Sequence, residues 1–299
     1  MIIVTGGTGF LGSFLAERLI REGRDVTIVD DLSTGDAANI AGLKCSFVRC
    51  DINDRNFLDL VDNDTEAVYH FAANAYVPTS IADPRRDFRS NVEGTFNLLE
   101  HVRKCGLGTK ILYASSAAVY GNPSRNPIFE HDRTLPVSPY GCSKLAGEHY
   151  CTVYSKLYGL KTASLRFFSS FGPRLKKQVI YDFMCKLREN GKVLKIAGDG
   201  KQVRDFNYVD NHIDAALVVK DFDGSVFNVA SGRTVTVLDV AKGVSAAMGL
   251  SPRFEFDAER KGDPVTWVPN IDKIKGMGYK PKVGFEEGIK RTVEWFNGH

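Results

Sequence analysis

The sequence predicts an α/β protein with a doubly wound parallel sheet and a smaller C-terminal α/β region. The first observation is a regular alternation of short apolar runs with amphipathic stretches over residues 1–170. The second is a glycine-rich turn directly after the first apolar run. The third is a looser rhythm after about residue 170, where Gly and Pro interrupt shorter segments. Strands that alternate with helices need crossover connections, which place helices on both faces of a parallel sheet.

The expected elements follow in chain order. Strands are expected at the apolar runs 2–5, 25–29, 45–48, 67–71, 110–115 and 162–168. Helices are expected at 13–22, 54–61, 88–104 and 143–158, where apolar residues recur at helical spacing. A helix near 208–220 and a strand at 225–230 are expected to return to the main sheet. We therefore predict one domain over 1–170, rejoined by 206–230, and a second over mainly 171–299.

Composition excludes several classes of protein. The chain has 299 residues, 43% hydrophobic and 25% charged, which is ordinary for a soluble globular protein. The net charge of +3, with no run of more than two Lys or Arg, argues against a nucleic-acid partner. No apolar stretch has the length needed to span a bilayer. Six cysteines without a Cys-x-x-Cys pair or zinc-ligand spacing predict free thiols in a reducing cytoplasm and no metal site.

The segment TGGTGFLG, residues 5–12, predicts a dinucleotide-binding loop. Gly6, Gly9 and Gly12 form G-x-x-G-x-x-G between a strand and a helix, which is the context that this signal requires. Glycines permit a sharp turn and a close backbone approach to a pyrophosphate, and the helix N-terminus offers N–H groups to that anion. Phe10 and Leu11 belong to the same turn. The region is thus predicted to be a Rossmann-type domain, with a tight turn that binds no ligand as the alternative.

An acidic residue follows at the spacing expected for a ribose contact. Asp30 ends the second strand, 18 residues after Gly12, and predicts hydrogen bonds to the adenosine ribose. Its charge repels a 2′-phosphate, which favours NAD over NADP. Asp31 can share this role or cap the following turn. The cofactor site is expected to include, further along, Ser33, Thr34, Asp51 and Ile52. An ordinary strand-end turn is the alternative for the last two.

A second cluster predicts acid–base chemistry. Tyr140 and Lys144 form the only Tyr-x-x-x-Lys pair of the sequence, on a helix expected to start with Ser138 as N-cap and Pro139 as its first residue. Ser116 ends the fifth strand, at the sheet edge where parallel sheets bind ligands. We expect the lysine cation to lower the pKa of the phenol and so to make Tyr140 a general base. The alternative is an amphipathic helix with a buried Tyr and a solvated Lys.

Several segments carry a resemblance to a known family. They are TGGTGFLG, HFAANA, SSAAVYG, SPYGCSK, LRFF followed by FGPR, and GDGKQVRDFNYVD. They occur in the order of the extended short-chain dehydrogenase/reductase family, and the whole chain resembles its nucleotide-sugar epimerase/dehydratase branch, nearest to the UDP-glucose 4-epimerases. The resemblance implies NAD as cofactor and epimerisation at C4 of a UDP-hexose through a transient 4-keto sugar. Epimerases of UDP-N-acetylhexosamines or UDP-uronates, and nucleotide-sugar dehydratases or reductases, are the alternatives.

The same resemblance implies individual roles. Tyr140 would take the proton of the sugar 4-hydroxyl, Ser116 would bind the same oxygen, and Lys144 would hold the nicotinamide ribose. Further implied cofactor contacts are Ala72, Ala73, Asn91, Ser115 and Phe167. A homodimer through the helices at 88–104 and 143–158 is also implied, although the apolar face of 92–102 can equally pack on the sheet. Related dehydratases carry an Asp-Glu pair where this chain has Ala117 and Ala118, which cannot move protons.

The substrate site is expected to bind a diphosphate, for which arginines are suited. The implied substrate contacts are Ser116, Ser169, Arg174, Arg204, Arg260, Asp263 and Trp267. Ser169 stands where relatives commonly have Asn, and the lysines at 176 and 177 can compensate for that loss. Trp267, four residues after Asp263, is expected to crowd the sugar pocket and to disfavour 2-acetamido sugars. The alternative for this indole is a core or interface aromatic.

Overall fold

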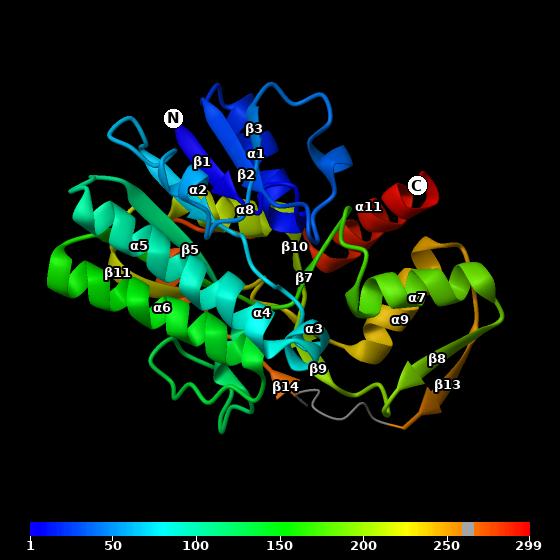
Figure 1. The fold of residues 1–299 in the computed structure, drawn as a ribbon. Coiled ribbons are helices and arrows are strands. Elements are labelled where there is room, and N and C mark those ends of the chain that lie inside the picture. Colours follow the sequence, from blue (N-terminus) through cyan, green and yellow to red (C-terminus); the bar gives the residue numbers. More distant parts are fainter. Residues whose placement is uncertain (259–265) are drawn as a thin grey trace.

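The structure, a computed structural model, describes residues 1–258 and 266–299. Seven parallel strands form the main sheet in the order β11-β6-β5-β4-β1-β2-β3 (Figure 1). Their bounds are β1 (Ile2–Thr5), β2 (Val26–Asp30), β3 (Ser46–Arg49), β4 (Ala67–His70), β5 (Lys110–Ser116), β6 (Lys161–Phe167) and β11 (Asp223–Val229). The predicted doubly wound parallel sheet is confirmed. Its strand order reverses between β4 and β1, which opens a crevice at the carboxyl ends of the strands.

Helices cover both faces of this sheet because alternate side chains of each strand point to opposite sides. On one side, Ile2 and Val4 of β1 pack with apolar residues of α1 and α8. On the other side, Ile3 packs with apolar residues of α5 and α6. The helices of the first face are α1 (Phe10–Arg21), α8 (Val209–Val218) and α10 (Asp272–Gly276). Those of the second are α2 (Arg55–Leu58), α5 (Gly94–Lys104) and α6 (Pro139–Tyr158).

Two helices differ from the sequence prediction. The stretch 88–104 is not one helix: α4 (Pro84–Phe88) leads into a π-helical segment, η2 (Arg89–Glu93), before α5 begins. The stretch 54–61 contains only the single turn of α2. The predicted start of α6 is confirmed, since Pro139 is its first residue and the Ser138 hydroxyl accepts a hydrogen bond from the Gly141 N–H at 3.1 Å.

The C-terminal region has its own core beside the main sheet (Figure 1). Its helices are α7 (Gln178–Glu189), α9 (Val237–Ala247) and α11 (Phe285–Asn297). Small sheets join β7 (Ser170–Phe171) to β10 (Asn207–Tyr208), β8 (Val193–Ala197) to β13 (Arg253–Asp257), and β9 (Val203–Asp205) to both β12 (Thr234–Thr236) and β14 (Thr266–Trp267).

The chain crosses between these two parts more than once. After β10 it returns to the main sheet as α8 and β11, and β11 pairs with β6. The remaining short segments are η1 (Ala37–Ile40), α3 (Val77–Ala82) and η3 (Ala117–Tyr120). The division into a cofactor domain and a substrate domain stays a prediction. Among the helices described, none is long and apolar enough to cross a membrane.

Candidate active site

The glycine loop lies at the carboxyl end of β1, next to the chain that follows β4. Gly6 has φ +65°, and a Cβ on it would lie 2.7 Å from the backbone N of Ala72. A Cβ on Gly12 would lie 2.2 Å from the Gly6 carbonyl oxygen. No side chain caps α1, whose N-cap is Gly9, so the N–H groups of its first turn are left for an anion. Close packing therefore requires these glycines, and the loop presents a phosphate-sized cradle.

Polar groups around this loop fit a dinucleotide. The hydroxyl of Thr8 is buried and has no hydrogen-bond partner in the described part of the chain. The Asp30 carboxylate is 6% exposed and accepts hydrogen bonds from the N–H groups of Thr8 at 3.0 Å and Leu32 at 2.9 Å. These bonds fix Asp30 beside the loop while each oxygen keeps a free lone pair. The uncapped N–H groups suit a pyrophosphate and the carboxylate suits ribose hydroxyls, so the residues fit NAD.

The other residues predicted near the adenosine form local turns. The Asp31 carboxylate accepts from the Ser33 N–H at 2.8 Å, and Thr34 is exposed next to it. The Asp51 carboxylate accepts from the backbone and side-chain N–H groups of Asn53. Ile52 is buried in the core. The geometry of Asp51 and Ile52 matches the strand-end turn that the sequence left open, and their contact with the cofactor stays a prediction.

The structure brings Ser116 and Tyr140 together. Ser116 is the last residue of β5, and its hydroxyl accepts a hydrogen bond from the Ala118 N–H at 3.2 Å. Tyr140 lies in the first turn of α6, where its N–H donates to the Ser80 hydroxyl at 3.1 Å. Burial raises the pKa of Tyr140, a hydrogen bond with Ser116 lowers it, and the charge of Asp87 raises it. The two hydroxyl groups therefore lie near each other at the sheet edge.

Lys144 lies one turn further along α6 and is 2% exposed. Its ammonium nitrogen sits 5.0 Å from the centroid of the Tyr113 ring, which offers a cation–π contact. Burial lowers the pKa of Lys144 to about 8, against the charge of Asp87. In this structure burial and the charge of Asp87 raise the pKa of Tyr140 and Ser116 lowers it, so the lowering by Lys144 that was expected beside bound NAD stays a prediction. The alternative of a solvated Lys144 is wrong, because this side chain is buried.

A buried polar network surrounds Tyr140 and Lys144. Of its other residues, only Asn91 was predicted from the sequence. The Asn91 side-chain amide donates to the Ser143 hydroxyl at 2.9 Å and to Asp87 at 3.1 Å, and its carbonyl accepts from the Asn74 N–H at 2.8 Å. Asp87 is 1% exposed. The Asp87–Asn91 spacing of four residues is the same helical signal as Tyr140–Lys144, and it could have identified Asp87.

Ser115 takes part in a different buried network. Its hydroxyl donates to the Glu148 carboxylate at 2.8 Å. Glu148 also accepts from Arg166 at 2.9 Å and 2.5 Å, and both side chains are almost fully buried. Arg166 donates in addition to the Tyr120 hydroxyl at 2.6 Å. This ion pair ties α6 to β5 and β6 directly behind Ser116. Contact of Ser115 with the cofactor stays a prediction.

The remaining predicted cofactor residues lie at the carboxyl ends of β4 and β6. The Ala72 N–H donates to the Thr5 hydroxyl at 3.2 Å, and Ala73 follows in the same loop. Phe167 ends β6, where its ring stacks on Phe71 at 5.9 Å between centroids. These residues border the crevice beside β1 and β4. Their positions suit a ligand at the carboxyl edge of the sheet.

The predicted substrate residues are only partly brought together. Arg204 on β9 pairs in register with Trp267 on β14. The Trp267 indole donates to the Gly121 carbonyl at 3.1 Å, and its ring meets Phe168 edge-on. Ser169 follows β6, and its carbonyl accepts from the Asn207 N–H at 2.8 Å. Arg260 and Asp263 lie outside the described residues, so their predicted roles stay untested.

Arg174 and its neighbours contact the cofactor side of the molecule. The Arg174 guanidinium donates to Glu17 at 2.8 Å and to Ser13 at 3.1 Å, and it lies over the Phe14 ring. Arg174 thus joins the loop after β7 to α1. The Lys176 ammonium lies 3.6 Å from Asp36, and the Lys177 ammonium donates to the Ala75 carbonyl at 2.9 Å. Three cations of this segment therefore contact the cofactor domain. Arg174 meets helix α1, and Lys176 and Lys177 meet the loops that follow β2 and β4.

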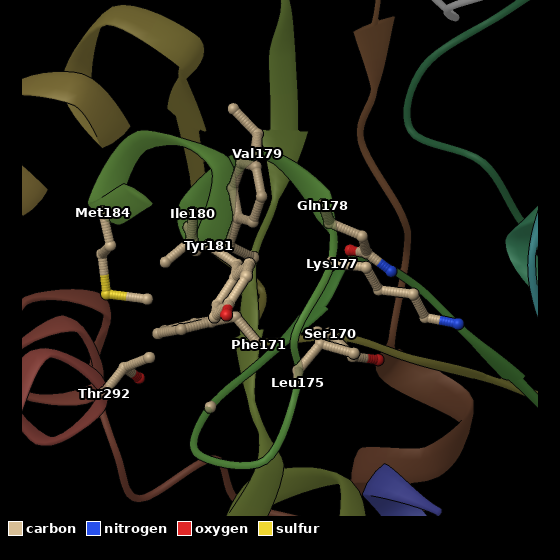
Figure 2. A pocket seen from close by; sticks show the side chains of 12 residues that line it. Ser170, Phe171, Leu175, Lys177, Gln178, Val179, Ile180, Tyr181, Met184 and Thr292 are labelled. Carbon is tan, nitrogen blue, oxygen red and sulfur yellow. The ribbon is translucent and has the colours of Figure 1, made fainter. Parts of the chain in front are cut away.

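A small pocket lies where α7 begins (Figure 2). Its volume of about 10 Å³ is far below that of a nucleotide-sugar site. Figure 2 shows Lys177 extending away from the apolar lining made by Ile180 and Met184. This pocket is therefore too small to be the nucleotide-sugar site. In the described residues, no group of three or more His, Cys, Asp or Glu could hold a metal ion, and the six cysteines are free.

The fold and the site together define a class: a dinucleotide-dependent enzyme with a Ser–Tyr–Lys centre at the edge of a Rossmann-type sheet. Comparison with known proteins agrees. Residues 2–230 match the NAD dependent epimerase/dehydratase family. The chain belongs to this family, the extended short-chain dehydrogenase/reductases, and its cofactor is NAD.

Individual relatives resemble it over their full length. A putative UDP-glucose 4-epimerase of Methanocaldococcus jannaschii is 36% identical, over 100% of this chain and 99% of the relative. The crystal structure of a Thermus thermophilus UDP-glucose 4-epimerase in complex with NAD is 35% identical, covers 99% of both chains and has a TM-score of 0.90. A UDP-N-acetylglucosamine 4-epimerase of Methanobrevibacter ruminantium, in complex with UDP-N-acetylmuramic acid, is 32% identical, covers 99% and 98%, and has a TM-score of 0.92. Relatives of similar likeness thus differ in substrate.

Proposed function

We propose that this protein catalyses the NAD-dependent epimerisation of a UDP-hexose at C4, with UDP-glucose and UDP-galactose as its substrates. The observation that carries the proposal is the placement of the Ser116 and Tyr140 hydroxyl groups near each other at the carboxyl edge of the sheet, beside the buried Lys144. This arrangement offers one base and one hydroxyl to a single sugar oxygen. The UDP-glucose 4-epimerases among the similar proteins support the choice of substrate.

The chain supplies the proton chemistry and the positioning, while NAD, when bound, accepts and returns a hydride. Tyr140 takes the proton of the sugar 4-hydroxyl and later gives it back. Ser116 holds the same oxygen by a hydrogen bond. Burial favours the neutral phenol, so ionisation of Tyr140 needs nearby positive charge. Lys144 is the buried cation of the same helix face, and we assign to it the nicotinamide ribose.

The residues that hold NAD follow from the geometry of the loop. The N–H groups at the start of α1, with Phe10, Leu11 and Gly12, take the pyrophosphate. Asp30 takes the adenosine ribose. The crevice between β1 and β4 brings these groups to the same edge as Ser116.

A dehydratase is the runner-up, and one observation argues against it. Ala117 and Ala118 follow Ser116 in η3 and carry no group that can move a proton. Elimination of water across C5 and C6 would need such groups near the sugar. A change of substrate within the epimerases is the closer alternative, because a similar structure is a UDP-N-acetylglucosamine 4-epimerase.

The choice between plain and acetylated hexoses depends on Trp267. Its indole is held by the Gly121 carbonyl, at the end of the segment that starts with Ser116. This hydrogen bond holds the indole in one orientation near the end of strand β5. A fixed bulky ring disfavours a 2-acetamido group, because overfilling a packed site costs about 1–3 kcal/mol.

The proposal is tested by incubating the protein and NAD with UDP-glucose and separating the products. Formation of UDP-galactose without net reduction of NAD supports it. A 4-keto-6-deoxy product supports the dehydratase, and turnover of only acetylated or uronate sugars supports another epimerase. The variant Tyr140→Phe, assayed alongside, controls for contaminating activities.

We also propose a homodimer formed by α5 and α6. These helices lie side by side (Figure 1). Their exposed apolar side chains are Phe96, Tyr150, Val153, Leu157 and Tyr158. Leu98, Leu99 and Val102 are instead buried against the sheet. This part of the apolar face 92–102 therefore packs on the sheet, as the alternative prediction stated. A monomeric mass by light scattering at micromolar concentration contradicts the proposal.

The cytoplasmic location expected from the free thiols stays a prediction.

A further inference from the structure

Asp87 is a buried carboxylate that the proposed mechanism does not use. It lies at the end of α4, just before the π-helical segment η2, and is 1% exposed. A π-helical turn adds a residue to the helix and is often found at functional sites. Here it begins at Arg89, two residues after Asp87, and contains Asn91, whose amide donates to the carboxylate at 3.1 Å. A buried carboxylate is costly unless it is hydrogen-bonded and faces a positive charge.

The contacts of Asp87 lead to the catalytic pair by two routes. The first is a chain of hydrogen bonds, in which the Asn91 amide donates to Asp87 at 3.1 Å and to Ser143 at 2.9 Å, and the Ser143 hydroxyl donates to the Tyr140 carbonyl at 3.0 Å. The second is electrostatic. Burial raises the pKa of Asp87, while Ser143 and the charge of Lys144 lower it, and the charge of Asp87 in turn raises the pKa of Lys144 against the effect of burial.

The other titratable groups around Lys144 cannot replace this carboxylate. His70, on β4, is fully buried and neutral, because burial and the charge of Lys144 lower its pKa to about 3. Tyr113, on β5, has its pKa raised well above the ordinary value by burial. Cys151, on α6, has its pKa raised to about 12 by burial. Glu148 is bound to Arg166 and Ser115. Asp87 is thus the carboxylate whose charge favours the protonated form of Lys144.

We propose that Asp87 is a positioning residue, whose buried carboxylate holds Asn91 and, through Asn91 and Ser143, the start of α6, and whose negative charge stabilises the Lys144 ammonium. It acts through Lys144 and Tyr140 and touches neither substrate nor cofactor. The inference rests on the proposed function, because it assigns to Lys144 a role that needs the charged ammonium. Removal of this carboxylate lowers the pKa of every nearby group, including Lys144 and Tyr140.

The test compares the pH dependence of kcat for the wild type, Asp87→Asn and Asp87→Glu, each with bound NAD. Loss of a nearby charge shifts a pKa by about one unit. We expect the acidic and the basic limb of the kcat–pH profile of Asp87→Asn to move to lower pH by about one unit. Turnover at pH 8 is expected to be reduced. Asp87→Glu keeps the charge, so its limbs are expected to stay near the wild-type positions. Asp83→Asn is the matched control, since Asp83 caps the same helix at an exposed position.

A second readout does not depend on turnover. Ultraviolet titration of tyrosinate gives the ionisation of Tyr140 as the difference between each protein and its Tyr140→Phe counterpart. The difference curve of Asp87→Asn is expected at lower pH than that of the wild type. If the protein lacks epimerase activity but this curve shifts, the proposed function fails while the electrostatic role of Asp87 stands.

The outcomes that overturn the proposal are equally defined. Lower turnover with unmoved limbs and an unmoved tyrosinate curve would show that Asp87 is merely structural. If Asp87→Asn does not fold, Asp87→Ser offers a smaller neutral side chain for the same measurements. If neither neutral variant folds whereas Asp87→Glu does, the role is structural and the proposal is wrong.

Discussion

The buried ion pair behind the catalytic strand makes a strong prediction about stability. In Glu148→Gln the side chain keeps its shape but loses its charge, while the Arg166 guanidinium stays buried. Glu148 accepts three hydrogen bonds, two from Arg166 and one from Ser115, between 2.5 and 2.9 Å. Breaking a buried pair on one side costs about 3–5 kcal/mol, because a charge is left without its partner. We expect this loss in the free energy of unfolding, which is roughly two to four powers of ten in the equilibrium constant.

Urea denaturation, followed by circular dichroism without added NAD, measures this loss. The control is Glu286→Gln, which removes the carboxylate of an exposed bidentate pair with Arg233 and is expected to cost less than about 1 kcal/mol. Replacing both Glu148 and Arg166 by Met removes the stranded charge and is expected to recover most of the stability. The reasoning is refuted if Glu148→Gln loses no more than Glu286→Gln.

Four further predictions concern the site. Tyr140→Phe is expected to bind NAD but to lose nearly all turnover, because it removes the base; turnover within tenfold of wild type contradicts the assignment. Lys144→Met is expected to be inactive but more stable, with a free energy of unfolding at pH 7 that is higher by up to about 3 kcal/mol. The reason is that burial lowers the pKa of the ammonium from 10.5 to about 8, and the variant no longer buries this charge. Between pH 8 and 10.5 the unfolded wild type binds more protons than the folded protein, so the stability of the wild type rises with pH in this range. Urea titrations of Lys144→Met at several pH values are expected to lack this rise. Fluorescence titration is expected to show tighter binding of NAD than of NADP, since Asp30 repels the 2′-phosphate; equal binding argues against this. Trp267→Ser is expected to raise kcat/KM for UDP-N-acetylgalactosamine relative to UDP-galactose, and the absence of a relative gain excludes the steric role.

Sequence-local patterns were sufficient for much of the site. Gly6 and Gly12 are needed by a turn between adjacent elements, so a short motif identifies them. Tyr140 and Lys144 share a helix face because they are four residues apart, and Ser138 with Pro139 marks where that helix starts. Alternating strands and helices gave the parallel sheet for the same reason. Each of these features depends on neighbours within a few residues, which the sequence displays directly.

Partners from distant segments were decided by the tertiary structure alone. The sequence predicted an anionic substrate contact for Arg174, but the structure pairs it with Glu17, 157 residues away. It gave no sign that the Ser115 hydroxyl donates to Glu148, which lies 33 residues further along the chain. It related the pKa of Tyr140 to Lys144 alone, and the structure adds burial, Ser116 and Asp87 as groups that shift it. Burial and countercharge depend on how helices such as α4 and α6 meet over the sheet, and no spacing along one helix records that meeting.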